Sequence, residues 1–172
     1  MLLIVSKLSE LNFTKLIQVH HDSIMSTGKE RYPFCTEVEQ RFRAESDFYH
    51  YLNSVFFRQS NSFYAIWDDI GEYKAVLRLE PYCDGLLLCA LETAPEARKK
   101  GFATLLMNAI LSNLHTRNVG TVYSHVDKMN IASLSVHRKC GFQIIKNHAV
   151  YSDGSVIHDS YTLAYTFKKS EI

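Results

Sequence analysis

Three short segments rich in Val, Ile, Leu and aromatic residues follow one another in the middle of the chain, at Ser62–Asp68, Tyr73–Leu79 and Leu86–Leu91. The turn signals Asp68-Asp69-Ile70-Gly71 and Asp84-Gly85 separate them. Apolar runs of this length, bounded by such turns, are typical of strands joined by hairpins. The pattern therefore predicts a sheet of at least three strands, which helices must cover to bury its apolar residues.

Helical periodicity lies on both sides of these strands. Before them, Met1–Val5 is typical of a first strand, Ser9 can cap a helix, and a second helix begins at about Thr36. The apolar positions of the two helices are Phe13, Leu16, Ile17, His20 and Ile24, and then Val38, Phe42, Tyr49, Leu52 and Phe56. The charges between the apolar positions of the second helix, Glu37 and Glu39 among them, are expected to form a solvated face.

After the three strands, the period becomes helical from Gly101. The remaining segments are expected to be a strand at Thr121–Val126, a short helix at Asn130–Lys139, and a closing pair formed by Phe142–Tyr151 and Val156–Phe167 around a turn. The order β-α-α-β-β-β-α-β-α-β-β predicts an α/β (α+β) fold with a mixed sheet flanked by helices.

Length and composition limit what else the chain can be. Its 172 residues, with no repeat or linker, predict a single domain over residues 1–172. The formal net charge is +1, so no global field favours nucleic acid or anionic lipid. We find no run of about 20 apolar residues and no signal-peptide pattern, so we expect no membrane contact and, by default, a cytoplasmic location. Four cysteines without C-x-x-C spacing predict reduced, mostly buried thiols.

The segment Leu91–Ala103 carries a strand through a turn into an amphipathic helix. Unpaired N–H groups and the positive end of the helix dipole favour an anion at a helix start, and small residues at Gly101 and Ala103 let a phosphate approach the backbone. Arg98-Lys99-Lys100 adds positive charge there. On physical grounds alone, this is either a phosphate site or an ordinary solvated turn.

This segment resembles the cofactor loop of the GNAT superfamily of acyl-coenzyme-A-dependent N-acetyltransferases, written R/Q-x-x-G-x-G/A after a strand ending L-x-V-x-P. The matching residues are Leu91, Thr93, Pro95, Arg98, Gly101 and Ala103. Downstream, Asn130–Phe142 is similar to the family's N-x-x-A/S-x-x-x-Y-x-x-x-G-F. The resemblance covers nearly the whole chain except residues 20–60. It implies a mostly antiparallel GNAT-like sheet and an enzyme that moves an acetyl group to an amine.

The resemblance also implies the cofactor and its contacts. Acetyl-coenzyme A is the expected cosubstrate, without a metal; amides of Lys99 to Thr104 would cradle its pyrophosphate, while backbone near Leu91 and Thr93 and the side chain of Asn130 would bind pantetheine. The full set of expected cofactor contacts is Leu91, Thr93, Arg98, Lys99, Lys100, Gly101, Phe102, Ala103, Thr104, Asn130 and Ser133.

Three residues are candidates for acid–base catalysis. His125 ends the strand before Asn130, where some members of the family carry an acidic base, and strand alternation puts it on one face with Tyr123 and Asp127. Glu92, at the end of its strand, is the rival base. His137 stands where the family frequently has a tyrosine that is thought to protonate the departing thiolate. Each of the three has a plain structural alternative, as a satisfied or packed side chain.

Other interpretations remain open at the level of sequence. Glu80 is a candidate to hold the positive charge of the acceptor, and tyrosines between residues 30 and 82 are candidates to line its pocket. His20-His21-Asp22 is not expected to bind a metal, because adjacent helical residues point in different directions. The acceptor is a small-molecule or peptide amine of unknown identity, no oligomeric state is predicted, and the alternative function is a noncatalytic acyl-coenzyme A sensor.

Overall fold

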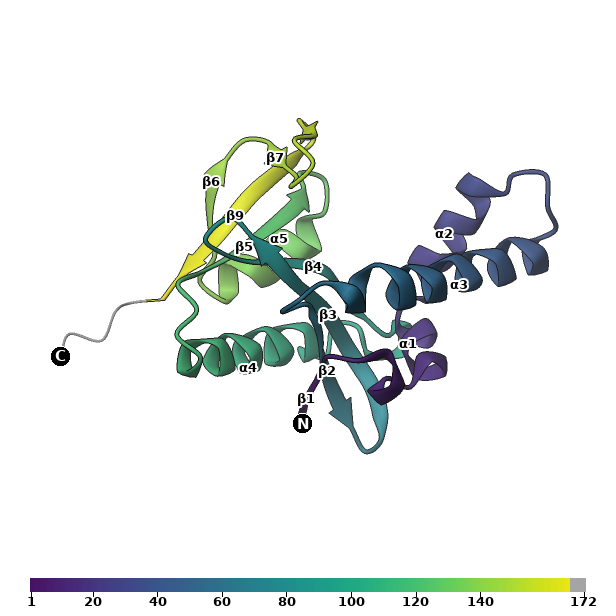
Figure 1. Cartoon of the computed structure of the whole chain (residues 1–172), viewed down its shortest axis with the longest axis horizontal. Helices are drawn as coiled ribbons and strands as arrows, with labels where there is room; N and C mark the ends of the chain where they lie inside the picture. Colours follow the sequence, from purple (N-terminus) through teal and green to yellow (C-terminus); the bar gives the residue numbers. More distant parts are fainter. Residues whose placement is uncertain (168–172) are drawn as a thin grey trace.

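The computed structural model describes residues 1–167, which form one seven-stranded sheet in the order β1-β2-β3-β4-β5-β9-β6, flanked by helices (Figure 1). The strands of this sheet are β1 (Leu2–Val5), β2 (Phe63–Asp69), β3 (Glu72–Tyr82), β4 (Gly85–Thr93), β5 (Thr121–Asp127), β6 (Gln143–Lys146) and β9 (Ser160–Thr166). Every neighbouring pair is antiparallel except β4 and β5, which run parallel. The mixed, mostly antiparallel sheet and the two hairpins that join β2, β3 and β4 are confirmed.

The N-terminal helices differ from expectation in how they begin and break. Residues 8–10 form a short 3-10 turn that contains Ser9, and Asn12 caps α1 (Phe13–Val19) by accepting a hydrogen bond from the Lys15 amide. The predicted single helix ends at His20, and α2 (His21–Arg31) follows it directly. The prediction of one helix capped by Ser9 is therefore wrong, because a second cap and a backbone break at His20 divide the apolar stripe.

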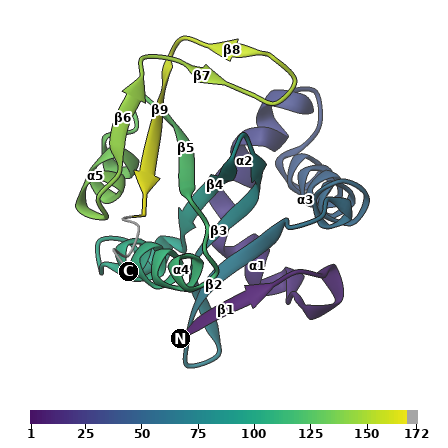
Figure 2. The same ribbon diagram turned by 60° about the vertical axis from the view of Figure 1, so that its left-hand side comes forward.

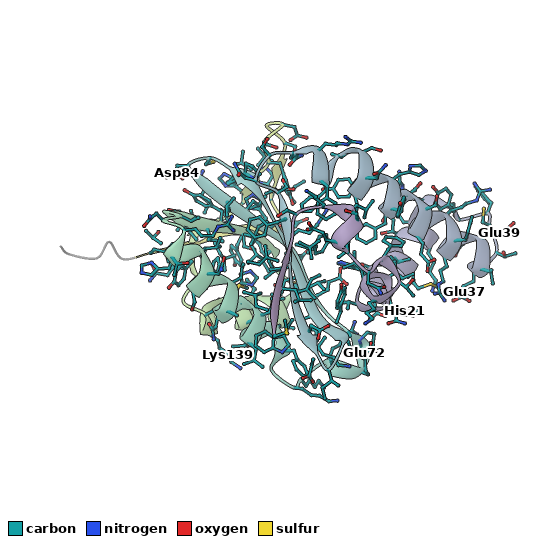
Figure 3. All side chains as sticks on the ribbon, turned by 60° about the horizontal axis from the view of Figure 1, so that its bottom comes forward. His21, Glu37, Glu39, Glu72, Asp84 and Lys139 are labelled. Carbon is teal, nitrogen blue, oxygen red and sulfur yellow. The ribbon has the colours of Figure 1, made fainter. Side chains whose placement is uncertain are left out.

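The next helix begins where the sequence predicts. Thr36 and Glu39 form a reciprocal capping box at the start of α3 (Glu37–Ser54). Helices α2 and α3 project together from the body of the fold, and Figure 3 shows Glu37 and Glu39 at the far end of this projection. Both side chains are exposed, as expected for the charged face of this helix.

Two apolar cores lie on the two faces of the sheet. One face packs against α4 (Phe102–Thr116) and α5 (Ile131–Lys139), through Leu106, Ile110 and Leu134. The other face packs against α1 and α3, through Leu16 and Leu52. Figure 2 shows α4 and α5 on one side of the strands and α1, α2 and α3 on the other. Helices thus cover both faces of the sheet over these two cores.

An irregularity in β4 changes which residues face each core. Arg78 of β3 pairs with Cys89, whereas Val76 pairs with Glu92, so β4 has one residue more than β3 over this stretch. This is a β-bulge, and Ala90 within it has a positive φ of 49°. Because paired residues share a face, Cys89 and Glu92 point to the same side although three positions separate them.

The C-terminal region is more elaborate than the predicted closing pair. Of the predicted segment Phe142–Tyr151, β6 is the part that pairs with β9, over Gln143–Lys146. Between them, β7 (Ala149–Val150) and β8 (Val156–Ile157) form a separate two-stranded ribbon, which Figure 2 shows crossing the end of the sheet. The continuous pairing predicted over Phe142–Tyr151 is therefore wrong.

The cysteines and helices bear on two further expectations. Cys140 is buried, but Cys83 is exposed and Cys35 and Cys89 are intermediate, so the prediction of mostly buried thiols is wrong. All four thiols are free. Within residues 1–167, none of the helices has the length and apolar character needed to cross a membrane.

The contact between β4 and β5 begins at Gly85, where a side chain has no room. A Cβ atom at this position would lie 2.1 Å from the Thr121 carbonyl oxygen. We expect Gly85→Ala to lower the free energy of unfolding by about 2 kcal/mol, because backbone has to move to relieve the overlap. Gly120→Ala is the matched control, since nothing lies within 4 Å of its new Cβ, and it should change stability by less than about 0.5 kcal/mol. Equal effects in urea denaturation would contradict the expected overlap.

Candidate functional site

The strands β4 and β5 pair only where Leu86–Leu88 of β4 lie beside Val122–Ser124 of β5, and beyond this point they separate. A cavity of about 490 Å³ occupies the gap, with Leu91, His125 and His137 among its lining residues. From Cys89 onward, the edge of β4 that faces the gap has no partner strand in the described chain. An open strand edge of this kind can pair with an extended ligand.

Glu92 lies at the centre of the arrangement. It lines the gap between the strands, a second cavity of about 620 Å³ beneath the start of α4, and a third of about 540 Å³ beneath α2 and α3. The bulge at Ala90 puts Glu92 on the face that α1, α2 and α3 cover. A molecule in either of the two larger cavities can therefore reach this carboxylate.

His20 holds this carboxylate. Its Nδ1 atom lies 2.8 Å from Glu92 Oε1, and its side chain is 4% exposed. The Tyr64 hydroxyl lies 3.4 Å from His20 Nε2, and burial raises the pKa of Tyr64, so the phenol keeps its proton. In the Nδ1–H tautomer, His20 donates to Glu92 and can accept from Tyr64. Sequence analysis considered His20 as part of a helical stripe and as a metal ligand, and missed this contact, which depends on the bulge that turns Glu92 toward the helices.

The cavity beneath the start of α4 has the shape and charge of an anion site. Lys99 and Gly101 both have positive φ, of 61° and 85°, and Gly101 is the N-cap. The first amide of α4 with an intrahelical acceptor is that of Leu105, which donates to Gly101, so the amides of residues 102–104 are left for a ligand. An anion here would meet free N–H groups and the positive end of a 15-residue helix.

Most of the residues that sequence analysis assigned to cofactor binding meet in this cavity. Its lining includes Leu91, Thr93, Arg98, Lys99, Gly101, Phe102, Ala103, Thr104, Asn130 and Ser133. Lys100 is exposed and does not line it. Arg98 has a further task, because its Nη2 atom lies 2.7 Å from Asp22 of α2 and its Nε donates to the Thr93 carbonyl. Part of its charge is therefore used to tie the turn to α2.

Sequence analysis assigned Ser133 of α5 to this cavity but missed three further residues of the same helix. Ala132, Val136 and Lys139 line it together with Ser133. Their spacing of four and then three residues puts them on one face of the helix, which is the signal that could have identified them. Asn130 caps this helix by accepting from the Ser133 amide, so the side-chain NH₂ of Asn130 is the group left for a ligand.

His125 lines the gap but both of its ring nitrogens are engaged. Nε2 lies 3.1 Å from the Val150 carbonyl oxygen, which can only accept, and Nδ1 lies 3.2 Å from the Thr162 hydroxyl. The Tyr82 hydroxyl donates to the same Val150 carbonyl. Burial lowers the pKa of His125. These contacts connect β5 to the β7 segment.

His137 is also enclosed, with 1% of its surface exposed. Nδ1 lies 2.8 Å from the Ser133 carbonyl oxygen, and Nε2 lies 2.9 Å from Ser124 Oγ. Ser124 Oγ in turn lies 3.2 Å from the Leu88 carbonyl, the last residue of β4 that pairs with β5. His137 therefore belongs to a hydrogen-bonded chain that links α5 to the point where the strands separate.

Two predictions about the acceptor concern Glu80 and the tyrosines. Glu80 accepts a hydrogen bond from the Cys89 thiol at 3.7 Å and lines none of the three cavities. Of the tyrosines between residues 30 and 82, Tyr51 lines the cavity beneath α2 and α3. Residues 1–167 contain no cluster of three or more His, Cys, Asp or Glu side chains arranged to hold a metal ion.

Comparison with known proteins agrees with this geometry. The model of the acetyltransferase (GNAT) family matches residues 24–142. Among curated proteins, none matches closely enough to indicate a relative. The fold is similar to that of PaiA N-acetyltransferase from Thermoplasma acidophilum in complex with coenzyme A, with a TM-score of 0.65 and 15% identity over 97% of this chain and 99% of that one.

Two further structures share the fold. Ribosomal-protein-alanine N-acetyltransferase from Brucella melitensis has a TM-score of 0.62 and 16% identity over 96% of this chain and 99% of its own. An aminoglycoside 6'-acetyltransferase of type Ii has a TM-score of 0.60 and 18% identity over 95% and 96%. At these identities, the similarity establishes the shared fold.

The burial of His137 predicts a pH dependence of stability. Burial lowers the pKa of His137 in the folded protein, below the value near 6.5 of an exposed histidine. The unfolded chain therefore binds more protons than the folded one below about pH 6.5, so this contribution destabilises the fold as the pH falls. We expect the unfolding free energy of His137→Gln to fall less steeply than that of the wild type between pH 7.5 and 5. Parallel curves in chemical denaturation would contradict the buried, neutral imidazole.

Proposed function

Because this chain belongs to the acetyltransferase (GNAT) family, we propose that it moves an acetyl group from acetyl-coenzyme A to a primary amine by direct attack in a ternary complex. The observation that supports this most is the position of Glu92, which lines both the cavity beneath the start of α4 and the cavity beneath α2 and α3. Two substrates bound in these cavities would meet at one carboxylate.

The cavity beneath the start of α4 is the proposed coenzyme A site. The amides of residues 102–104 and the N-terminal dipole of α4 would bind the pyrophosphate, with Lys99 and Lys139 adding charge at the rim. The unpartnered edge of β4 at Leu91 and Thr93 would pair with the amides of pantetheine, and Asn130 would donate to the same arm. This arrangement directs the thioester along the gap toward Glu92.

Glu92 is the base that we favour. A lysine-like amine is mostly protonated at pH 7, and exposing its free form costs about 4–5 kcal/mol. Nitrogen becomes more acidic as it bonds to the carbonyl carbon, so a carboxylate beside it can take the proton in the transition state. The contact with His20 fixes one oxygen of Glu92 and leaves the other for the amine. His125 is less suited, because Val150 and Thr162 engage both of its ring nitrogens.

The other half of the reaction needs less help. Backbone N–H groups near Leu91 and Glu92, beside the bulge, would polarise the thioester carbonyl. A thiol with a pKa near 8.5 leaves readily as thiolate, so a dedicated acid has a small effect. We therefore propose that His137 positions Ser124 and α5 in place of donating a proton, because its two nitrogens already contact Ser124 and Ser133.

The alternative to an acetyl transfer is a chain that only senses acyl-coenzyme A. Transfer is tested by following the acetyl-coenzyme-A-dependent release of free thiol with a panel of primary amines, including amino acids, peptides, polyamines and amino sugars. Thiol release that requires an acceptor, together with a mass increase of one acetyl group in that acceptor, is expected. Tight binding of coenzyme A without transfer to any amine would favour the sensor. A single domain over residues 1–172 and a cytoplasmic location remain part of the proposal.

The proposed coenzyme A site predicts a difference between two substitutions in one turn. Gly101→Val forces a branched side chain into a backbone with φ of 85° and into the space that the pyrophosphate would occupy. We expect it to weaken coenzyme A binding by 10-fold or more in calorimetry. Lys99→Ala removes one exposed, screened charge and should weaken binding by about threefold or less. Unchanged affinity in Gly101→Val would contradict the site.

The proposed base predicts a loss of turnover without a loss of cofactor binding. Glu92→Gln keeps the size of the side chain but cannot accept the amine proton, so kcat should fall by about 10²–10⁴ while coenzyme A affinity stays within about twofold. His125→Ala is the comparison and should reduce kcat by about threefold or less. If His125→Ala caused the larger fall, His125 would replace Glu92 as the base.

A further inference from the structure

A cationic side chain on the covered face of the sheet forms no ion pair with a carboxylate of the described residues. Arg78 of β3 points to the same side as Val76, which packs in the core beneath α1 and α3. It lines the cavity of about 540 Å³ beneath α2 and α3, which is within the size range of cavities that hold small molecules. A position of this kind in a strand ordinarily holds an apolar residue.

The neighbours of Arg78 are mainly aromatic. Its guanidinium carbon lies 5.0 Å from the centre of the Tyr51 ring and 5.5 Å from that of Phe56. Its Nε atom is buried and has no hydrogen-bond partner within the described residues. The two rings support the cation through their π faces but carry no negative charge to neutralise it.

The other charges around this cavity already have partners. Arg31 lies 2.8 Å from Asp47, which also accepts from the Tyr32 hydroxyl, and Glu92 is held by His20. Glu80, two positions along β3 on the same side, forms no ion pair with Arg78 within 4.0 Å. Among the described side chains that line the cavity, Arg78 is thus the cation that lacks a carboxylate.

An unpaired guanidinium in a mostly buried position is unfavourable, and a bound anion relieves the cost. The planar fork of N–H donors fits a carboxylate best, through two parallel hydrogen bonds. The same cation disfavours an acceptor with a second ammonium group. Glu92 lies diagonally across the strand pair from Arg78, since Glu92 pairs with Val76, two residues along β3. Those two residues amount to about 7 Å along the strand.

We propose that the acceptor is a small amine that also carries a carboxylate, with the amine at Glu92 and the carboxylate at Arg78. The inference rests on the proposed acetyl transfer and names the class of acceptor for the same site. Arg78 acts here as a specificity-determining residue, and free amino acids and short peptides are the two sources of such molecules.

The first test needs only the wild-type enzyme. Acetyl transfer is measured for matched pairs in which the carboxylate is replaced by a carboxamide, using α-amino acids, ω-amino acids and dipeptides, with diamines as the cationic comparison. We expect each preferred acid to have a kcat/KM at least 10-fold above that of its amide, mainly through KM. The substrate class with the highest kcat/KM shows whether the acceptor is a free amino acid or a peptide. Equal values for acids, amides and diamines would overturn the proposal.

The second test assigns the preference to Arg78. In Arg78→Gln, the KM for the acid should rise at least 10-fold, and the difference between acid and amide should vanish, while the coenzyme A affinity stays unchanged. Arg31→Gln is the matched control, because Arg31 lines the same cavity but is already paired with Asp47, and the acid preference should persist there. A preference that persists in Arg78→Gln would overturn the assignment. If this variant does not fold, the acid preference is measured in Arg78→Lys, which keeps the charge but loses the two-pronged contact. A smaller preference is expected there, and an unchanged one would overturn the assignment.

Failure of the proposed acetyl transfer can be separated from failure of this inference. If no amine is acetylated, binding of the same acids and amides to the protein saturated with coenzyme A is measured by calorimetry. Binding of an acid over its amide that Arg78→Gln abolishes would support the carboxylate site. Absence of any such difference would overturn it.

Discussion

The extra residue in β4 is the constraint on which the site depends. In a regular strand, Glu92 would point to the same side as Leu86 and Leu88, into the core beneath α4. The bulge at Ala90 reverses this alternation and puts the carboxylate opposite the covering helices α1, α2 and α3. The same local twist accompanies the separation of β4 from β5 beyond Leu88. One inserted residue thus both aims the carboxylate and opens the gap beside it.

The polar groups on the two sides of the gap serve different purposes. On the side of α5, His137 and Ser124 are saturated by neighbours, so they hold the helix and strand in position. On the side of α2 and α3, His20 holds Glu92, while the buried Nε atom of Arg78 has no hydrogen-bond partner within residues 1–167. Buried polar groups whose hydrogen bonds are all made within the protein stabilise the fold. Buried polar groups that lack a hydrogen-bond partner gain one when a ligand binds. This difference separates the structural polar residues from those that we assign to substrate.

The aromatic residues of the N-terminal half contribute to the site in the same way. Phe48, Phe56 and Tyr64 pack around His20 and Arg78, so both polar side chains approach the cavity through an apolar wall. An environment of this kind strengthens the electrostatic contact between a buried charge and its partner. The helices α2 and α3 thus line the proposed acceptor site and also cover the sheet.

The sequence by itself determined most of the order of the strands and helices, the start of α3 near Thr36, and the turn from Arg98 to Thr104, because each depends on residues close together in the chain. It also identified Glu92 and His125 as titratable groups near the site, but not which nitrogen or oxygen was free. Only the tertiary structure decided that His20 meets Glu92, that His125 is engaged by Val150 and Thr162, and that Arg78 Nε has no partner among the described residues. The physical reason is that a role in acid–base chemistry depends on unoccupied hydrogen-bonding positions, and these are filled by residues distant in the chain.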